Sequence, residues 1–397
     1  MRSLFSDLAF RKNLIWFGAF NLLLYLFIWR FNSLVPFNYP GYVNDTHHFL
    51  SDPKAQNHKF NLISGLAQYD AQWYLKIAAD GYTFSPTDKQ SLVDKSKMQN
   101  LTFAFFPLYP WLIKTWLLWV KDVQWSAFIT SQVLLVANFV SLYYVVTKFF
   151  SAQVALKTSW LVFLFPFSIF FRSYYAENLL LLLLIWFSYL MMQKKWLVSG
   201  ILLSVINITK GTVVLLNVVY FVYLLREIRY QKINIRSLII YLGVPMILPL
   251  GWVIFNYLST GNPLFFYTVQ TAWYHPEPFW YHVIFNLFLV VNFWRLPLHT
   301  IHFSQIDVIT TVLTSYVLIV SRKQLPRILW WVSFSIFLTP LLVRDLAAFG
   351  RFQSISFPLF AYLASKTKGG AYAALVLIFG AGLLTAAVFF VNWYWIG

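Results

Sequence analysis

Long apolar segments, separated by short polar ones, occupy nearly the whole chain. Several have about 15 residues rather than the roughly 20 that a full bilayer crossing needs. Such short or broken helices are common where a membrane protein builds a cavity at depth. The pattern predicts an all-α polytopic membrane protein with about 10–12 transmembrane or re-entrant helices in a single domain, residues 1–397. The segments begin near Leu14, Phe103, Ala127, Thr158, Ala176, Trp196, Thr212, Ser237, His302, Ile328, Phe352 and Ala371.

Composition supports the membrane assignment. Hydrophobic residues make up 59% of the 397 positions and charged residues 11%, whereas a soluble domain has about 25% charged residues. The net charge of +17 does not indicate nucleic acid, because Lys and Arg stand in short runs between apolar segments. That placement is typical of cytoplasmic loops that face anionic membrane lipids. The absence of Cys excludes disulfides, thiolate metal sites and Cys nucleophiles.

The basic runs also predict the topology. An inside N-terminus and a retained first span, Leu14 to Trp29, place residues 32–102 in a long outside loop. The basic positions at 194–195, 226–232, 322–327 and 366–368 then lie inside, and residues 172–177, 209–211, 260–273 and 344–351 lie outside. If Phe103–Val120 and Ala127–Thr147 both cross the membrane, the number of crossings no longer agrees with this placement of the basic residues. We therefore expect one of the two to be a non-crossing element.

The apolar run Trp196 to Leu225 is too long for one ordinary span. Two short helices that meet at Lys210-Gly211 satisfy the charge rule and bring Lys210 to the outer interface. The alternative is a single tilted helix with a snorkelling Lys.

The outside loop holds six acids: Asp45, Asp52, Asp70, Asp80, Asp88 and Asp94. Five lie in polar, turn-rich surroundings and are expected to be solvated. Asp70 instead lies within residues 66–80, whose helical spacing puts it on one face with Trp73, Tyr74 and Ile77. An interfacial helix with this face on the membrane would partly desolvate the carboxylate and improve it as a general base. The alternative is an ordinary surface Asp.

Further ionisable residues are expected on the same side of the membrane, where they tend to mark function. They are Glu177, Lys210, Arg344, Asp345 and Arg351. Cations beside one or two carboxylates suit a lipid phosphate next to a general base. A purely structural alternative pairs Glu177 with Arg172 or Lys210, and Asp345 with Arg344. The segment Asn44 to His48 contains metal-ligand types, but adjacent His side chains point apart and no ligand motif or phosphate-binding Gly loop accompanies them.

Six blocks, in order between about residues 14 and 365, resemble the PIG-V family, the second mannosyltransferase of GPI-anchor synthesis, and its bacterial relatives. Ala176, Lys210 and Asn262 replace the Ser, Arg and Asp that are usual in these blocks. The blocks are Tyr69-Asp70-Ala71-Gln72-Trp73-Tyr74 through Gly81-Tyr82, Phe105-Phe106-Pro107-Leu108-Tyr109-Pro110, Ser173-Tyr174-Tyr175-Ala176-Glu177, Thr209-Lys210-Gly211, Thr260-Gly261-Asn262-Pro263-Leu264 with Gln270 and Trp273, and Gly350-Arg351-Phe352 to Phe357-Pro358.

The resemblance implies a GT-C fold and inverting transfer of mannose from a polyprenyl- or dolichyl-phosphate donor to a hydroxyl of a glycolipid, glycan or protein. Asp70 would be the base, and no cofactor or metal would be needed. Arg351, Lys210 and Arg344 would bind the donor phosphate. Lys210 would bind it less tightly than the usual Arg, because Lys acts as a point charge and not through two donors. The further substrate-binding candidates are Trp73, Tyr74, Tyr109, Glu177 and Gln270.

Two alternatives to this function stay open. The same cations could bind a phosphate in a lipid or sugar-lipid transporter, although the chain shows no pair of similar halves. A related transferase could use another polyprenyl-linked sugar. The short chain and compact first loop favour a bacterial inner membrane over the endoplasmic reticulum, with membrane lipids as surroundings and no nucleic-acid partner.

Overall fold

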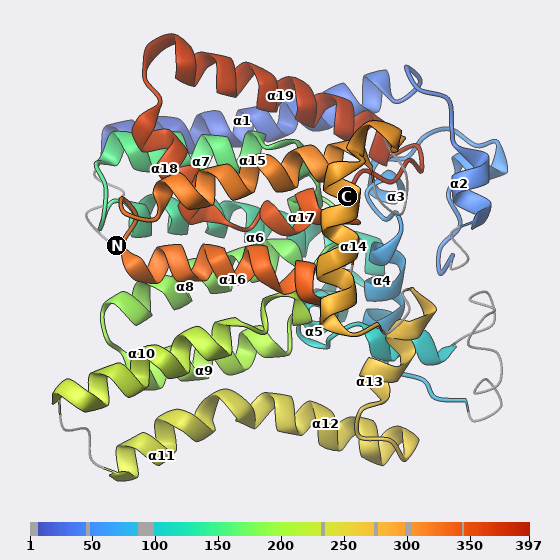
Figure 1. The fold of residues 1–397 in the computed structure, drawn as a ribbon. Helices are drawn as coiled ribbons and strands as arrows, with labels where there is room; N and C mark the ends of the chain where they lie inside the picture. The colour runs from blue at the N-terminus through green and yellow to red at the C-terminus, as the bar shows by residue number, and fades with distance from the viewer. Residues whose placement is uncertain are drawn as a thin grey trace.

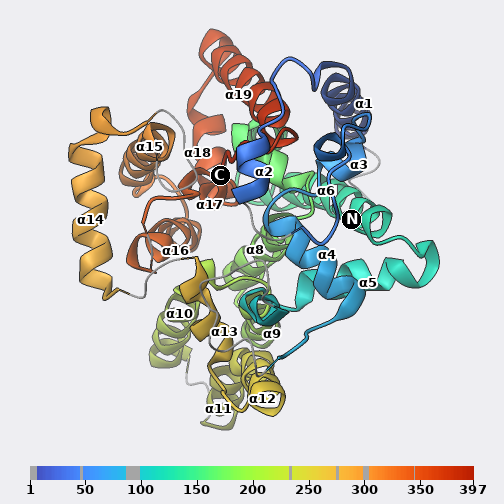
Figure 2. The ribbon, with the colours of Figure 1, turned by 90° about the vertical axis from the view of Figure 1, so that its right-hand side faces the viewer.

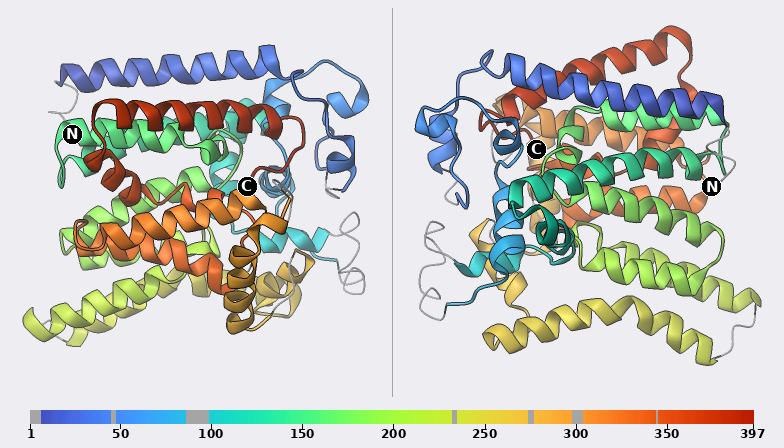
Figure 3. Two further views of the ribbon diagram at one scale, coloured as in Figure 1. Left: turned by 45° about the horizontal axis from the view of Figure 1, so that its top comes forward. Right: turned by 180° about the vertical axis from the view of Figure 1, so that it is seen from behind.

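The computed structural model describes residues 7–44, 48–85, 99–231, 235–273, 277–297, 304–343 and 345–397. All regular secondary structure in these ranges is helical, which confirms the predicted all-α class. Most helices lie side by side in one bundle (Figure 1). The helix pair α1 and α19 lies at one edge of this bundle, and α11 with α12 lies at the opposite edge (Figures 1 and 3).

Four helical segments are long and apolar enough to cross a membrane: α1 (Leu8–Phe31), α6 (Val123–Val146), α19 (Gly369–Phe390) and residues Arg236–Thr260, which comprise most of α11 (Ile235–Gly243) and all of α12 (Ile247–Thr260). Six apolar helices are shorter: α7 (Ala152–Leu164), α8 (Glu177–Met192), α9 (Trp196–Asn207), α14 (Phe279–Val291), α15 (Gln305–Ser321) and α16 (Arg327–Val343). The other α-helices are α2 (Tyr39–Asn44), α3 (Leu62–Gly65), α4 (Asp70–Asp80), α5 (Leu108–Val120), α10 (Leu216–Gln231), α13 (Phe265–Thr268), α17 (Phe349–Gln353) and α18 (Phe357–Lys366).

The burial pattern suits a protein surrounded by lipid. Large apolar side chains are exposed on the outer helices, for example Ile15, Leu118 and Ile319, where water would oppose them and hydrocarbon does not. The central helix α6 has 61% of its apolar window buried, whereas the edge segment Arg236–Thr260 has 11%. The chain is therefore an integral membrane protein with α6 inside the bundle.

The two ends of the bundle differ in charge and structure. The connections at residues 194–195, 322–327 and 366–368 lie at one end, and α2, α3 and α4 lie at the other (Figure 1). The view along the bundle in Figure 2 shows α5 lengthwise, so α5 runs across the end that carries α4. The orientation of α5 suits the predicted non-crossing element, whereas α6 is long and apolar enough to cross the membrane.

One element was not anticipated. Helix α14 also runs across this end of the molecule rather than along the bundle (Figure 1). Its sequence is mostly apolar, with His282 and Asn286 as exceptions, but no helix was predicted between the segment that begins near Ser237 and the one that begins near His302. With 13 residues, α14 is too short to span the bilayer by itself.

The predicted break at Lys210-Gly211 is confirmed. Helix α9 ends at Asn207 and α10 begins at Leu216, and the two run back along each other (Figure 1). The side-chain amides of Asn207 and Asn217 donate to each other at 2.9 Å in both directions. These bonds satisfy polar groups at the turn, so the alternative of a single tilted helix is wrong.

The predicted interfacial helix 66–80 needs two corrections. It begins at Asp70, because Leu66 to Tyr69 form a turn. Its apolar face contacts protein rather than lipid: Trp73, Tyr74 and Ile77 are buried, and α4 packs on α5 and α6. The aromatic spacing therefore reflects a core-facing helix.

Candidate active site

Asp70 is the first residue of α4 and follows a strained turn. Tyr69 has φ 53° and ψ −122°, a conformation that costs a non-glycine residue on the order of 1–3 kcal/mol and persists only where the surroundings enforce it. The Asp70 side chain is 24% exposed, which makes it the most accessible member of the ionic cluster described below. Its position at a helix N-terminus also favours a negative charge.

Glu177 is the first residue of α8, and its side chain is 1% exposed. The next residue, Asn178, fixes this helix start, because its amide donates to the carbonyl oxygens of Ser131 at 2.9 Å and Phe171 at 2.7 Å. Asn138 of α6 in turn donates to the Asn178 carbonyl at 2.7 Å. The buried carboxylate of Glu177 is therefore held by the rigid centre of the bundle.

The two cations of the cluster come from other elements. Lys210 lies at the break between α9 and α10, and Arg351 lies on the short helix α17. The start of α17 is held by Asp307 of α15, whose carboxylate accepts the backbone N–H of Phe349 at 3.2 Å. The side chains of Lys210 and Arg351 are 13% and 5% exposed.

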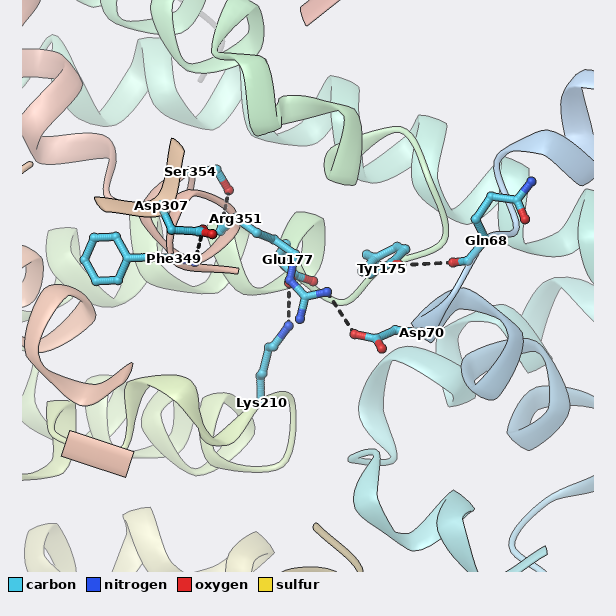
Figure 4. Close-up of polar contacts among 9 residues, drawn as sticks. All are labelled: Gln68, Asp70, Tyr175, Glu177, Lys210, Asp307, Phe349, Arg351 and Ser354. Carbon is cyan, nitrogen blue, oxygen red and sulfur yellow. Dashed lines mark hydrogen bonds and ion pairs between the residues drawn. The ribbon is translucent and has the colours of Figure 1, made fainter. Parts of the chain in front are cut away.

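These four side chains form a chain of alternating charges (Figure 4). The Arg351 Nη1 donates to Asp70 Oδ2 at 2.9 Å, and the Arg351 Nε lies 2.9 Å from Glu177 Oε1. Lys210 Nζ donates to the same Glu177 oxygen. The cluster is balanced, with two cations against two carboxylates. Arg351 pairs with both acids, whereas Lys210 shares the Glu177 oxygen with Arg351. Lys210 is therefore the less fully neutralised cation and can still attract a further anion.

Aromatic rings surround the Arg351 guanidinium. Its Cζ lies 5.2–5.4 Å from the ring centroids of Phe170, Tyr175, Phe352 and Trp395. Such contacts stabilise a cation while they exclude water. The Tyr175 hydroxyl also donates to the Gln68 carbonyl at 3.0 Å (Figure 4). This bond connects the aromatic rings around Arg351 to the turn before Asp70.

The aromatic residues predicted to bind substrate lie beside Asp70 and are buried. Trp73 stacks on Phe105 at 5.8 Å, and Tyr74 meets Tyr109 edge-on at 5.2 Å. Gln270 donates to the Ala104 carbonyl at 2.8 Å, so its amide nitrogen is used in joining two segments of the chain. These side chains are therefore engaged in contacts within the protein.

Some predicted members are placed differently. Arg344 lies outside the described residues, and Asp345 accepts the backbone N–H of Ala347 at 3.1 Å. Arg172 does not pair with Glu177, because it is fully buried and its Nε donates to Asn21 Oδ1 at 2.8 Å. The expected partner Lys210 does bind Glu177.

The first loop contains one acid whose environment was predicted wrongly. Asp52 is 5% exposed, whereas it was expected to be solvated. Asp80 is exposed and pairs with Lys76, and Asp45, Asp88 and Asp94 lie outside the described residues. The Asp52-Pro53 sequence reads as an ordinary turn, so only the tertiary structure reveals that burial.

The segment Asn44 to His48 is only partly described, since residues 45–47 fall outside the described ranges. The His48 ring stacks on Tyr42 at 3.9 Å. Among the described residues, no three His, Asp or Glu side chains gather as metal ligands would.

The helical membrane bundle with an ionic site at one end is consistent with the GT-C class of polytopic glycosyltransferases. Residues 106–255 match the family of dolichyl-phosphate-mannose-protein mannosyltransferases. The match spans less than half of the chain; it contains Glu177 and Lys210 but neither Asp70 nor Arg351. It supports membership of the GT-C glycosyltransferases at the level of the class. No curated protein and no solved structure matches the chain.

Proposed function

We propose that the protein is an inverting mannosyltransferase that uses a polyprenyl- or dolichyl-phosphate mannose donor. The observation that carries this proposal is the pairing of Asp70 with Arg351 inside the four-residue chain of charges. It puts a partly exposed carboxylate beside two cations at the end of the bundle. A transferase of this class needs both a proton acceptor and a phosphate receptor.

Asp70 has one oxygen available for the base function. Arg351 binds Oδ2, and within the described part of the chain Oδ1 accepts no hydrogen bond. A carboxylate oxygen with free lone pairs can accept the proton of an acceptor hydroxyl. Glu177 is a poorer candidate for the base because its side chain is 1% exposed and already binds two cations.

The reaction then proceeds as a single displacement. The acceptor oxygen forms a bond to the sugar C1 as its proton passes to Asp70. The bond between C1 and the phosphate oxygen breaks, and its electron pair stays on the lipid phosphate. Arg351 and Lys210 stabilise the charge that develops there, Arg351 through a fork of donors and Lys210 as a point charge.

The finer assignment rests on sequence. We assign the chain to the PIG-V-like branch on the six ordered blocks, and to a bacterial inner membrane on its compact first loop, with the site facing outward. Trp73, Tyr74 and Tyr109 would contact the sugar or its acceptor. A transporter would use Arg351 and Lys210 in the same way but would give the Oδ1 of Asp70 no role.

The test is transfer from labelled polyprenyl-phosphate mannose by the purified protein in detergent or liposomes. We expect Asp70→Asn to lower kcat at least about 100-fold, the usual size of a general-base contribution, with donor binding within about threefold of wild type because Arg351 and Lys210 remain. The matched control is Asp80→Asn, at an acid of the same helix with a 45% exposed side chain. Full activity of Asp70→Asn would disprove the role of Asp70, and donor binding without turnover by the wild type would favour transport.

A further inference from the structure

Asp52 is a buried carboxylate outside the cluster of charges, and three neutral donors surround it. Its Oδ2 accepts the Gln68 amide at 2.9 Å and the Trp393 indole N–H at 2.8 Å, and its Oδ1 accepts the backbone N–H of Lys54 at 2.8 Å. Burial of a carboxylate is costly unless such donors replace water. With both oxygens occupied and 5% exposure, Asp52 is not placed to take a proton from a substrate.

The donor Gln68 belongs to the turn that presents Asp70. Gln68 is fully buried, and its carbonyl accepts the Tyr175 hydroxyl at 3.0 Å. Tyr69 follows in its left-handed conformation and Asp70 comes next. A strained residue of this kind keeps its conformation only when its neighbours are fixed, and Asp52 fixes the side chain of the residue just before it.

The donor Trp393 belongs to the segment that follows α19. Its ring centroid lies 5.1 Å from that of Tyr69, and the Trp395 centroid lies 5.0 Å from Tyr69 on one side and 5.2 Å from the Arg351 guanidinium on the other. The carbonyl of Trp393 accepts the Asn38 amide at 2.9 Å. This segment therefore contacts Arg351 and the residue just before Asp70, and Asp52 is hydrogen-bonded to it.

We propose that Asp52 is a positioning residue, which joins the Gln68–Tyr69 turn to Trp393 and so sets the Asp70 carboxylate against Arg351. The proposal rests on the proposed function, because it takes Asp70 as the base. The positioning itself can also be measured without turnover. Misplacement of a catalytic group by about 1 Å can cost 100-fold in rate.

The kinetic test is Asp52→Asn, which keeps the shape but replaces one acceptor by a donor. We expect kcat to fall 10- to 100-fold with the donor KM within about twofold, because Lys210 and Arg351 are unchanged. Trp393→Phe removes one donor to Asp52 and keeps an aromatic ring, so the fall in kcat should be smaller. The double substitution should be no worse than Asp52→Asn alone, since both act through one connection. Asp80→Asn is the control of equal charge change and should keep the kcat of the wild type.

A thiol reporter tests the positioning without activity. The chain has no Cys, so Ala71→Cys introduces a single thiol at a fully buried position next to Asp70. We expect the labelling rate of this thiol to rise at least fivefold in the Asp52→Asn background and to stay unchanged with Asp80→Asn. Ala127→Cys, at a fully buried position on α6, reports on opening of the whole bundle and should label at the same slow rate throughout.

The outcomes are separable. Unchanged kcat and unchanged labelling at position 71 in Asp52→Asn overturn the proposal. Equal rises at positions 71 and 127 also overturn it, because Asp52 would then support the entire fold. A third outcome is that the wild type shows no transfer while Asp52→Asn still raises the labelling rate at position 71 and not at position 127. In that case the proposed function fails and the positioning of the turn is supported.

Discussion

Glu177 is the residue on which the balance of charge in the site depends. Its buried carboxylate lies against Lys210 and Arg351, two cations that would otherwise repel each other in a poorly solvated place. Removal of one member of a buried ionic group leaves the rest uncompensated, which costs more than the group contributes as a whole.

We expect Glu177→Gln to lower the free energy of unfolding by about 3–5 kcal/mol, measured by denaturation in detergent. Glu227→Gln makes the same change at a pair with Lys194, whose side chain is 52% exposed. That control should cost less than about 1 kcal/mol. Equal losses of unfolding free energy in the two variants would show that the buried position of Glu177 between two cations adds nothing to its contribution to stability.

Helix α17 shows how an element determines the position of a charged side chain. It has five residues, too few for stability on its own, so its position depends on contacts. A Cβ added at Gly350 would lie 2.2 and 2.3 Å from ring carbons of Phe167. The absence of a side chain at position 350 therefore lets α17 approach the segment before α8 and brings Arg351 toward Glu177.

Gly350→Ala is expected to cost about 1–3 kcal/mol by overpacking and to lower transfer by moving Arg351. Thermal unfolding and mannose transfer by the same preparation measure both effects. Gly380→Ala in α19 is the matched control, since its added Cβ would meet nothing nearer than Leu164 at 3.9 Å, and alanine favours a helix by roughly 0.5–1 kcal/mol over glycine. A Gly350→Ala protein as stable and active as this control would contradict the argument.

At the scale of the molecule, one end of the bundle holds the basic connections and the other holds the site. This arrangement requires that α5 does not cross the membrane. Lys121, at the C-terminal cap of α5, then lies on the outer side, whereas a crossing α5 would put it inside. Lys323, between α15 and α16, is expected on the inner side.

Single-thiol labelling decides this topology, because the chain has no Cys of its own. In intact cells an impermeant reagent should modify Lys121→Cys at once and Lys323→Cys only after the membrane is opened. Both positions are exposed, so burial does not bias the comparison. Labelling of Lys323→Cys but not Lys121→Cys in intact cells would reverse the orientation.

The sequence by itself determined the membrane class, most helices and the broken helix around Lys210, and Asp70 stays its prediction for the base. Span length, hydropathy and the placement of Lys and Arg are local properties, and the bilayer acts on each segment separately. The same local pattern missed α14, because an apolar helix lying across the end of a bundle resembles an incomplete span.

Only the tertiary structure decided which charges meet. Asp70 and Arg351 are 281 positions apart, and Arg172, five residues from Glu177, was as plausible a partner by spacing as Lys210. The burial of Asp52 depends on Trp393, at the far end of the chain. Such contacts follow from how the helices pack, a property of the whole chain that no single segment carries.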